Sequence, residues 1–536
     1  MTGRTLAQAI LERLADLGID QVFGLPGVHN LAFWECDGAI PAICGVRHEQ
    51  SAAYAADGLA RATGRLGVAL TTTGPGAANA VAAFGEAAMS HSRILIISSE
   101  VSSLLKVDGV NRGILHEMND QAQLFAPLAS PGCAISAQTP DAALNAIETV
   151  INYMKTHDEV AGYIGIPSNL LAQEIAAPSI RSEVKPESNV DWSSALALIE
   201  QSERPVVYLG GGAANATGIS NFVSKLNAPI LTSFAGNGVH ASDLVVGAPL
   251  HEPEGHQLLL DADLLVMLGT DFDGMNSRNW QAPLPKNVLA VNIHEQPIST
   301  NVPQAHLVNA PLQQLQKLTD LISPKKRWIE SPSAIGNQMR ERLRNDERGS
   351  LGIKMIEQIE HAWPTDGNIV VDMTIGGYWM AGYSVQPRSR RLAYPVGWGT
   401  LGFGFPAAIG AASVAPTLSL CGDGGLMFAL GELATIRQEN LPLTLLLIDD
   451  GGYGMLRFDQ QVFGHHERGV DLFTPQWESM FAAFEFPVTT LTNMDELGAA
   501  LTANYGRPSV IIYRGVMHPP RTTSPRWREP LPTSSR

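Results

Sequence analysis

Short apolar segments recur along the whole chain, separated by longer stretches in which apolar residues return every three or four positions. The short segments are apolar throughout, which is typical of strands buried on both faces of a parallel sheet. The longer stretches, such as 142–153 and 432–438, have the period of helices. This alternation predicts an α/β fold with doubly wound, mainly parallel sheets. The predicted strands are 67–71, 94–97, 162–166, 205–209, 264–268, 288–292, 369–372, 418–420, 443–448 and 510–513.

Two stretches without a strand pattern divide the chain. Segment 172–191 holds prolines among serines and charged residues, and segment 324–349 is rich in Lys, Arg, Glu and Ser. Both compositions are typical of linkers. The last twenty residues are rich in Pro and Arg, so we expect them to form no packed element by themselves. The predicted units are three α/β domains at 1–175, 190–325 and 350–516, followed by a C-terminal tail at 517–536.

Composition narrows the class of protein. The chain has 536 residues, of which 45% are apolar and 16% are charged. This is ample material for several buried cores. The 52 acidic residues outnumber the 36 basic ones and give a net charge of −16. Because phosphate contacts need clustered Lys and Arg, we expect neither nucleic acid nor an anionic membrane as a partner.

Cysteine usage and hydropathy indicate the compartment. The cysteines are far apart and form no Cys-x-x-Cys pair, which argues against a disulfide scaffold and a structural zinc site. Segment 6–17 has the pattern of an amphipathic helix rather than of a signal peptide. No run of about 18 apolar residues predicts a membrane span. We therefore expect a cytoplasmic protein. The cysteines are Cys36, Cys44, Cys133 and Cys421.

Acidic residues follow two of the predicted strands in the third block. Gly-Asp-Gly-Gly at 422–425 follows one strand, and Asp-Asp-Gly-Gly-Tyr-Gly at 449–454 follows the end of the next. Open α/β sheets bind ligands at the carboxyl ends of their strands. Magnesium takes six oxygen ligands and prefers few carboxylates together with ligand phosphates. Asp423 and Asp450 therefore predict a magnesium site that also holds a phosphate-bearing ligand.

These residues carry a resemblance. Asp450 lies 27 positions after Asp423, and a Gly-Asp-Gly followed at this distance by an Asn- or Asp-containing turn resembles the signature of the thiamine diphosphate enzymes. The family pattern usually ends in Asn-Asn, whereas this chain has Asp449 and Asp450. Asp450 can still donate an oxygen, but it adds a negative charge to the site.

The first block resembles the same family independently. The carrying segments are Val-Phe-Gly-Leu-Pro-Gly at 22–27, Arg-His-Glu-Gln at 47–50 and Thr-Thr-Gly-Pro-Gly-Ala-Ala-Asn at 72–79, with Gly-Trp-Gly-Thr-Leu-Gly-Phe-Gly-Phe-Pro at 397–406 in the third block. Their order and spacing resemble the acetolactate synthase and 2-oxo acid decarboxylase family along nearly the whole chain. The resemblance implies that the three domains are a pyrimidine-binding, a middle and a diphosphate-binding domain.

The resemblance also assigns roles to single residues. It implies that Glu49 hydrogen-bonds the pyrimidine ring, so that the cofactor's own imine can remove the thiazolium proton. It implies that Leu401 forces the cofactor into a bent conformation, while backbone groups of Gly399 and Leu401 bond the pyrimidine edge. The other implied cofactor contacts are Thr374, Gly376, Gly424, Gly425 and Tyr453. The implied metal ligands are Asp423, Asp450 and Gly452.

Segment 111–121 distinguishes this chain from acetolactate synthases, which usually have Phe-Gln-Glu here. Its Arg-Gly-Ile-Leu-His-Glu run is similar to the branch that contains 5-guanidino-2-oxopentanoate decarboxylase. Histidine side chains in general titrate near neutrality, so His116 could protonate the enamine, or it could simply hold its loop. His91 lies in a Ser-His-Ser turn and is predicted to be structural. Further residues expected near the substrate are Pro26, Gly27, His29, Thr73 and Glu117.

The middle block offers two more polar features. Asp271 and Asp273 follow a predicted strand and could pair with a cationic substrate tail, or they could be solvated loop carboxylates. Gly210, Gly211 and Gly212 also follow a strand but lack the full dinucleotide fingerprint, so we expect a structural turn. The middle block could hold FAD, although no pattern indicates it.

Three functions are compatible with these residues. The first is a thiamine diphosphate- and Mg²⁺-dependent enzyme that decarboxylates a 2-oxo acid non-oxidatively, through a thiamine-bound enamine. The second is a carboligase of the acetolactate synthase type, and the third is a non-catalytic cofactor-binding paralogue, against which Glu49 and Asp423 argue. The resemblance implies a homodimer at minimum and commonly a homotetramer. The tail, with Trp527, could close over the active site or could be disordered.

Overall fold

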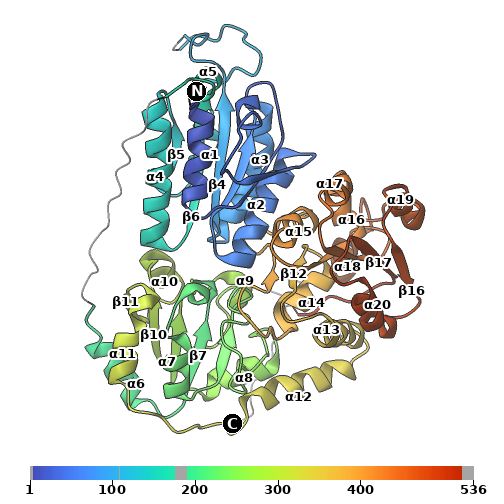
Figure 1. Cartoon of the computed structure of the whole chain (residues 1–536). Helices are drawn as coiled ribbons and strands as arrows, with labels where there is room; N and C mark the ends of the chain where they lie inside the picture. Colours follow the sequence, from blue (N-terminus) through green and yellow to red (C-terminus); the bar gives the residue numbers. More distant parts are fainter. Residues whose placement is uncertain (1–3, 108, 176–189, 522–536) are drawn as a thin grey trace.

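The computed structural model describes residues 4–107, 109–175 and 190–521. It contains three α/β units, each built on one sheet with helices packed around it (Figure 1). Every strand pair of the three described sheets is parallel, which confirms the predicted fold class. Among the described residues, no helix has the length and apolar composition that a membrane span requires.

The first domain has a six-stranded sheet in the order β2-β1-β3-β4-β6-β5. Its strands are β1 (Gln21–Gly24), β2 (Ala42–Gly45), β3 (Gly67–Thr71), β4 (Arg93–Glu100), β5 (Ala134–Ser136) and β6 (Val160–Pro167). Its helices are α1 (Leu6–Asp16), α2 (Glu49–Thr63), α3 (Pro75–Met89), α4 (Pro140–His157) and the short α5 (Ser168–Leu171). The predicted amphipathic N-terminal helix is α1, which buries Leu6, Ile10 and Leu14 on one face.

The middle domain has a five-stranded sheet in the order β11-β10-β9-β7-β8. Its strands are β7 (Pro205–Leu209), β8 (Ile230–Thr232), β9 (Leu264–Leu268), β10 (Asn287–Asn292) and β11 (His306–Asn309). Its helices are α6 (Ser193–Gln201), α7 (Ile219–Leu226), α8 (Pro253–Asp261), α9 (Gly274–Ser277), α10 (Glu295–Asn301) and α11 (Leu315–Leu321). The glycine turn after β7 packs on backbone, because a Cβ on Gly210 would lie 2.1 Å from the carbonyl oxygen of Gly269.

The third domain has a six-stranded sheet in the order β13-β12-β14-β15-β17-β16. Its strands are β12 (Asn368–Val371), β13 (Leu392–Ala393), β14 (Thr417–Gly422), β15 (Leu443–Asp449), β16 (Val488–Leu491) and β17 (Ser509–Arg514). Its helices are α13 (Ser350–Ala362), α14 (Ile375–Tyr383), α15 (Gly404–Ala412), α16 (Asp423–Leu426), α17 (Glu432–Gln438), α18 (Gly454–Val462), α19 (Trp477–Ala483) and α20 (Leu497–Asn504).

Each of the predicted apolar runs overlaps one of these strands, but the sequence did not predict β1, β2, β5, β8, β11, β13 and β16. These strands are two to four residues long. All of them except β1 lie at the edge of a sheet. A short edge strand buries little surface on both faces, so it has no continuous apolar run.

The linker prediction for 324–349 is wrong in part, because this segment contains α12 (Pro332–Arg344). The buried residues of α12 are Pro332, Gly336, Met339 and Leu343. Their spacing of three and four places them on one stripe, so the charged residues face outward. The high charge of the segment therefore reflects one solvated helix face rather than an irregular linker.

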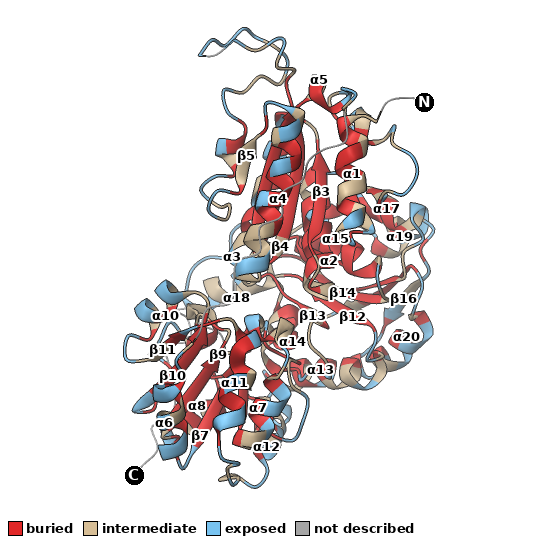
Figure 2. Cartoon of the chain, turned by 60° about the vertical axis from the view of Figure 1, so that its left-hand side comes forward, coloured by how far each residue is buried: buried red, intermediate tan, exposed pale blue. Residues whose placement is uncertain are grey.

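The first and third domains share a hydrophobic core. One cluster of buried residues contains Tyr54 and Phe84 of the first domain together with Phe403 and Trp477 of the third. At its centre α2 crosses α15 so closely that a Cβ on Gly58 would lie 1.9 Å from the carbonyl oxygen of Ala407. Buried residues are accordingly continuous from the first sheet through α2 and α15 (Figure 2).

The start of the tail also departs from expectation. Met517 is buried in a cluster that joins the middle and third domains. The indole nitrogen of Trp379 donates to the carbonyl of His518 (2.8 Å), and the Tyr383 hydroxyl donates to the carbonyl of Arg521 (3.3 Å). Residues 517–521 therefore pack along α14, because existing helices supply the surface that this segment cannot make for itself. Trp527 lies outside the described residues.

Candidate active site

The carboxyl ends of three adjacent strands meet at one edge of the third sheet, and each carries an acidic residue. Asp372 follows β12, Asp423 follows β14, and Asp449 and Asp450 close β15. Parallel pairing holds Gly422 opposite Ile448, so the segments after β14 and β15 leave the sheet side by side. The structure therefore brings Asp423 and Asp450 together, as the predicted metal site requires.

The Asp423 carboxylate is 2% exposed, and neither of its oxygens has a hydrogen-bond partner in the described chain. Burial, and then the Asp450 carboxylate, raises the pKa of Asp423 to about 7. Burial also raises the pKa of Asp450, against the charge of Arg457. Facing carboxylates in a buried site are unfavourable without a cation. The unpaired oxygens therefore fit a hard divalent cation such as Mg²⁺.

Arg457 in α18 fixes the loop that carries the other predicted ligand. Its guanidinium donates to the carbonyl oxygens of Asp450 (3.2 Å) and Gly451 (3.1 Å) and pairs with Asp471 (2.9 Å). It also places a positive charge beside the carboxylate that replaces the usual asparagine of the family. No spacing along the chain signals this role of Arg457.

Tyr453 closes the same loop against the turn after β14. A Cβ on Gly424 would lie 2.6 Å from Cε1 of Tyr453 and 3.4 Å from the carbonyl oxygen of Gly452. Only a residue without a side chain allows this approach. The predicted residues Gly424, Gly452 and Tyr453 therefore lie together at the edge that holds Asp423.

The predicted diphosphate contacts lie at this edge too. Thr374 precedes α14, and a Cβ on Gly422 would lie 3.0 Å from its Oγ1. Gly376 belongs to the first turn of α14, where backbone N–H groups have no partner within the helix and favour anions. A Cβ on Gly425 would lie 2.5 Å from Oδ2 of Asp372. These residues can hold a diphosphate next to the cation site.

Asp372 positions the loop that carries Leu401. Its buried carboxylate accepts the N–H groups of Met373 (2.8 Å) and Gly402 (3.0 and 3.1 Å to its two oxygens). Burial raises the pKa of Asp372 to about 6, although the N–H donors oppose this shift. Leu401 Cδ1 would lie 3.6 Å from a Cβ on Gly425, so its side chain faces the diphosphate edge. Sequence reasoning missed this role of Asp372, for which an acidic residue directly after an apolar strand is the available signal.

Glu86 of α3 holds the other end of this loop. Its carboxylate accepts the N–H groups of Gly397 (3.1 Å) and Trp398 (2.9 Å) and pairs with Arg61 (3.1 Å). Burial opposes the ionisation of Glu86, but the Arg61 charge and the N–H donors outweigh it and lower its pKa. Gly399, with a φ of +68°, adopts the left-handed conformation within the loop. The predicted pyrimidine contacts Gly399 and Leu401 are therefore held between the first and third domains.

Glu49 is the first residue of α2 and is buried. Its Oε2 accepts a hydrogen bond from the Asn79 amide (3.0 Å), and its Oε1 would lie 3.1 Å from a Cβ on Gly76. Both neighbours belong to α3, which follows β3. Glu49 therefore lies beside the carboxyl end of β3, the edge of the first sheet that corresponds to a ligand-binding edge.

Two histidines meet beside this edge. The rings of His29 and His116 make an edge-to-face contact with centroids 5.6 Å apart. Burial, and then His116, lowers the pKa of His29. A Cβ on Gly74 would lie 2.9 Å from Cβ of His116. The buried Thr73 hydroxyl donates to Gln121 (3.2 Å), a residue that the sequence did not single out.

Gly27 also lies close to this end of β3, since a Cβ on Gly27 would lie 2.7 Å from the hydroxyl oxygen of Thr72. A Cβ on Gly76 would touch the same threonine, which links Gly27 to the surroundings of Glu49. Pro26 is exposed directly beside Gly27. The structure thus gathers Pro26, Gly27, His29, Thr73 and His116 near Glu49.

The predicted acidic substrate contacts are arranged differently. Glu117 accepts the N–H groups of Arg112 (2.9 Å) and Ile114 (3.0 Å) and so shapes its own loop. Asp273 caps α9 by accepting from the Asn276 N–H (2.9 Å). Asp271 contacts His91 (2.8 Å). His91 precedes β4 and so lies at the amino ends of the strands of the first sheet, whereas Glu49 lies at their carboxyl ends. Within one chain, the structure does not bring Asp271 and Asp273 to Glu49.

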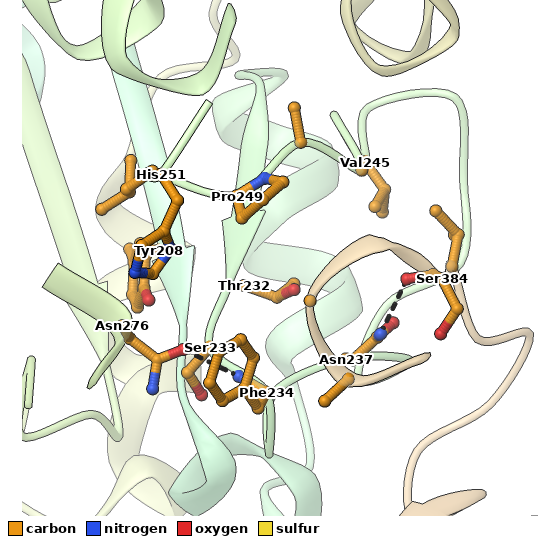
Figure 3. Close-up of a pocket in the computed structure, with 16 residues that line it drawn as sticks. Tyr208, Thr232, Ser233, Phe234, Asn237, Val245, Pro249, His251, Asn276 and Ser384 are labelled. Carbon is orange, nitrogen blue, oxygen red and sulfur yellow. Dashed lines mark hydrogen bonds between the residues drawn. The ribbon is translucent and has the colours of Figure 1, made fainter. Parts of the chain in front are cut away.

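A separate pocket lies between the middle domain and α14 (Figure 3). Its wall is held by hydrogen bonds from the Phe234 N–H to Asn276 (3.0 Å) and from the Asn237 amide to the carbonyl of Ser384 (2.8 Å). Burial, and then Arg278, lowers the pKa of the lining residue His251 to about 4. None of the predicted site residues, all of which are described, lines this pocket.

Comparison with known families agrees with this division of the site. Residues 4–124 match the N-terminal TPP binding domain of thiamine pyrophosphate enzymes, residues 192–318 match their central domain, and residues 374–513 match their C-terminal TPP binding domain. Glu49 lies in the first of these regions, and Asp423 and Asp450 lie in the third.

Whole-chain relatives lead to the same family. A protein of Pseudomonas aeruginosa named as a probable 2-ketoarginine decarboxylase is 31% identical, over 95% of this chain and 93% of its own length. The acetolactate synthase large subunit of Lactococcus lactis is 27% identical, over 91% of this chain and 88% of its own. A putative thiamine pyrophosphate-containing protein of Bacillus subtilis is also 27% identical, over 90% and 86%. The chain therefore belongs to the thiamine pyrophosphate enzyme family.

Proposed function

We propose that this protein is a thiamine diphosphate- and Mg²⁺-dependent enzyme that decarboxylates a 2-oxo acid. The observation that carries the proposal is the buried Asp423 carboxylate, whose oxygens have no partner and face Asp450. A paralogue that no longer binds the cofactor would gain stability by replacing either carboxylate of the Asp423–Asp450 pair, so the presence of both argues for ligand binding. The relative named as a 2-ketoarginine decarboxylase supports decarboxylation and a 2-oxo acid with a cationic tail.

The residues at the ligand-binding edges of the first and third sheets would have different roles in the reaction. Thiamine diphosphate, when bound, supplies the electron sink that allows carbon dioxide to leave a 2-oxo acid. Asp423, Asp450 and the Gly452 carbonyl would hold Mg²⁺, while Thr374, Gly376 and Gly425 would hold the diphosphate. Glu49 would share a proton with the pyrimidine ring, and the Leu401 side chain would pack against the cofactor.

The histidine pair would handle the substrate's proton. His29 has a lowered pKa and is therefore uncharged at neutral pH, so it can accept a proton. His116 touches it and lies over Gly74. Together they would deliver a proton to the product carbon. Their contact also suits a structural role, which the experiments below distinguish from proton transfer.

The substrate is tested with a panel of 2-oxo acids. The panel contains pyruvate, branched-chain 2-oxo acids and 5-guanidino-2-oxopentanoate, and carbon dioxide release and organic products are both measured. We expect the highest kcat/KM for an acid with a cationic tail and a single aldehyde product. A carboligated product from pyruvate alone would favour the acetolactate synthase type of activity instead. The Glu49→Gln variant provides the background rate.

The histidine role is tested with His116→Gln and His29→Gln. Proton transfer predicts a lower kcat with a changed pH profile and an unchanged KM for the cofactor. A purely structural role predicts a changed thermal stability with an unaltered pH profile. The exposed His465→Ala variant serves as the control.

A homodimer, or a tetramer made of two such dimers, would complete the active site. Exposed apolar side chains flank both halves: Leu104 (81% exposed) and Leu115 (74%) lie on the loops near His116, and Phe473 (92%) lies near the metal loop. Helix α18 buries none of its residues within one chain. Soluble proteins rarely leave such patches uncovered. The four cysteines are free, which suits a reducing compartment, and we place the enzyme in the cytoplasm.

Mixed dimers test whether two chains share one site. Glu49→Gln and Asp423→Asn chains are unfolded, mixed and refolded, or are co-expressed with different tags. If each site combines Glu49 of one chain with Asp423 of the other, half of the random dimers regain one intact site, and about a quarter of the wild-type rate returns. No recovery, with mixed dimers present by mass, would place both residues of a site in one chain. A yellow colour in the purified protein would reveal FAD.

A further inference from the structure

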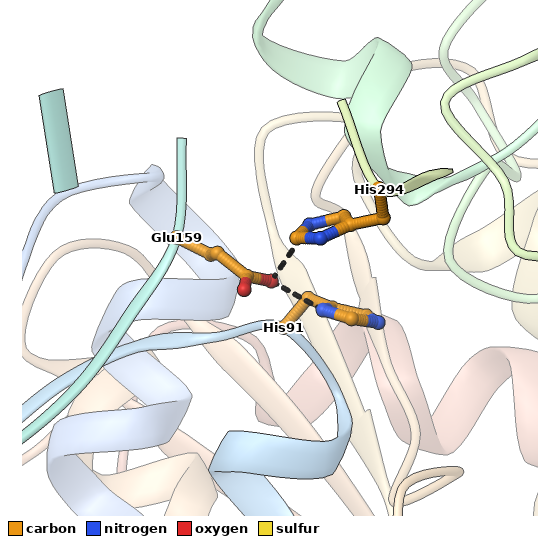
Figure 4. A group of neighbouring side chains, drawn as sticks. All are labelled: His91, Glu159 and His294. Carbon is orange, nitrogen blue, oxygen red and sulfur yellow. Dashed lines mark hydrogen bonds and ion pairs between the residues drawn. The ribbon is translucent and has the colours of Figure 1, made fainter. Parts of the chain in front are cut away.

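Four side chains converge where the first domain touches the middle domain, three of which are drawn in Figure 4. His91 lies between α3 and β4, Glu159 precedes β6, Asp271 follows β9 and His294 follows β10. Nδ1 of His91 is bonded to Oε2 of Glu159, and Nε2 of His294 lies 3.5 Å from the same oxygen. This cluster lies at the opposite edge of the first sheet from Glu49 and plays no part in the proposed reaction.

From this geometry we propose a transition-metal site, best suited to Zn²⁺, formed by His91, Glu159 and His294. One ligand atom from each of the three lies within 4.8 Å of the others. Zinc bonds to nitrogen and oxygen are about 2.0–2.2 Å long, so neighbouring ligand atoms of a tetrahedral ion are roughly 3.3 Å apart. His294 and Glu159 already have this separation. His91 and Glu159 need only move apart to admit the ion.

The fourth residue of the cluster supports the imidazole rather than the ion. Nε2 of His91 lies 2.8 Å from Oδ2 of Asp271, which leaves Nδ1 directed at Glu159 and His294. Metal-binding histidines usually donate their second ring N–H to a carboxylate, which orients the ring and raises its basicity. Asp271 thus supplies the carboxylate–histidine pair that is typical of zinc sites.

The middle-domain half of the site is held by one buried residue. The Asn292 amide donates to Oδ1 of Asp271 (3.1 Å), and its carbonyl oxygen accepts the backbone N–H of His294 (3.1 Å). Asn292 ends β10 and is buried. The two groups that it fixes therefore keep their separation without the ion, which reduces the entropy lost on binding.

Access and charge also suit a divalent ion. The His91 side chain is 49% exposed, so an ion can enter from solvent, whereas Glu159 is 16% exposed. His91 has a φ of +53°, a left-handed conformation that is uncommon for residues other than glycine, and its ring contacts Asp271 and His294 of the middle domain. Glu159 and Asp271 together neutralise two positive charges. Three protein ligands leave a fourth position for water or an added ligand.

The test measures metal binding rather than turnover. The full-length protein is stripped with chelator, reloaded with thiamine diphosphate and excess Mg²⁺, and titrated with Zn²⁺ against a chromophoric zinc indicator. We expect one equivalent of Zn²⁺ with micromolar or tighter affinity. With Co²⁺ in place of Zn²⁺, intense visible ligand-field bands should report four-coordination. The unfolding temperature should rise on binding, because the ion links two domains.

Matched variants locate the ion. His294→Ala should lose the tight equivalent and the Co²⁺ bands, and Asp271→Asn should weaken binding by about 10–100-fold. His91→Asn keeps the left-handed backbone conformation and should also abolish the site. The exposed His465→Ala variant should bind as the wild type does. Tight binding that survives in both His294→Ala and His91→Asn would overturn the proposal. Absence of tight binding to the folded wild type would also overturn it and leave a proton-linked ion-pair cluster only.

Discussion

The first and third domains are built on sheets of the same strand order, yet the residues that follow their third strands differ in charge. Counted from the first strand of each domain, both sheets have the order 2-1-3-4-6-5. The third strand of one ends before the hydroxyls of Thr72 and Thr73, and the third strand of the other ends before the carboxylate of Asp423. The same topology therefore presents threonine hydroxyls after the third strand of one domain, with Glu49 nearby, and the Asp423 carboxylate after the third strand of the other.

Two buried acidic residues, Glu100 of the first sheet and Asp423 of the third-domain sheet, differ in whether the chain supplies them with a partner. Glu100 ends β4 of the first sheet and is also buried, but it has Ser136 (3.0 Å) and Lys106 (3.7 Å) as partners within its own domain. Asp423 has no such partner in the described chain. A buried acid that is satisfied within the chain stabilises the fold, whereas a buried acid left unpaired indicates a ligand that the chain must bind.

The largest effect is expected at Glu49, beside the ligand-binding edge of the first sheet. Glu49→Gln should lower kcat by about 10²–10⁴-fold, since an amide cannot share a proton with the pyrimidine ring. Cofactor affinity should change little, because the proposed diphosphate contacts lie at the acidic edge of the third domain. Steady-state kinetics and cofactor titration measure the two effects separately. Glu100→Gln, at the other acid of this sheet, is the control and should leave kcat within about twofold. Near-normal turnover of Glu49→Gln would contradict the division between the two edges.

Removing the Asp423 carboxylate should change the stability of the protein in opposite directions with and without Mg²⁺ and thiamine diphosphate. The pKa of Asp423 is raised from its ordinary value to about 7 in the metal-free fold. The metal-free protein therefore loses stability as pH rises from about 4 to about 7, where the folded state must give up this proton. Asp423→Asn removes that loss and should stabilise the metal-free protein at pH 8 by up to about 4 kcal/mol.

With Mg²⁺ and thiamine diphosphate the wild type should be more stable than Asp423→Asn, because only the wild type binds these ligands tightly. Chemical denaturation at pH 4 and pH 8, with chelator or with both ligands, checks the four conditions. If the variant is less stable than the wild type in chelator at pH 8, the unpaired carboxylate is not unfavourable and the metal assignment fails.

A smaller effect is expected where the two domains meet. Glu86→Gln weakens the pair with Arg61 and the anchoring of the loop 397–400, while Asp57 still pairs with Arg61 (2.7 Å). We expect a loss of about 1–3 kcal/mol in the free energy of unfolding, together with weaker cofactor binding. Glu148→Gln breaks a similar buried pair with Arg13 (2.7 Å), far from the loop. That control should lose stability without losing cofactor affinity; equal cofactor loss in both variants would remove the special role of Glu86.

The smallest effect is expected at Asp450. Asp450→Asn restores the usual family residue, keeps an oxygen ligand and removes one charge that Arg457 now faces. The affinity for Mg²⁺ and cofactor should stay within a few-fold or improve, as measured by titration of the chelator-stripped protein. Arg457→Met is the informative companion, because it should weaken binding when Asp450 is kept and should matter less when it is combined with Asp450→Asn. A complete loss of activity in Asp450→Asn would reveal a further role for this carboxylate.

The sequence predicted the interior of each sheet and the approach of Asp423 to Asp450 at one edge of the third sheet. Central strands such as β14 and β15 are buried on both faces, so hydropathy alone identifies them. The site residues Asp423 and Asp450 follow such strands at a characteristic distance. The edge strands and the charged helix α12 escape prediction because their apolar residues are few or lie on one stripe.

The remaining site residues depend on contacts between distant segments. Glu86 lies more than 300 positions from the loop that it anchors, and His29 meets His116 through two separate loops. The turn around His91 predicts a structural role, but its partners Asp271 and His294 come from another domain. No spacing along the chain encodes such meetings, which arise only when helices and sheets pack.

The close crossing of α2 with α15 limits how this enzyme can be recombined with its relatives. The middle domain separates the first and third domains in sequence, yet these two bury one common cluster of side chains. A chimaera that exchanges only the first domain would set Ala407 of α15 against a foreign helix in place of the one that carries Gly58. Exchanging the first and third domains together preserves that contact. The middle domain shares a second buried cluster with the third domain, so a hybrid enzyme that replaces it must match that surface as well.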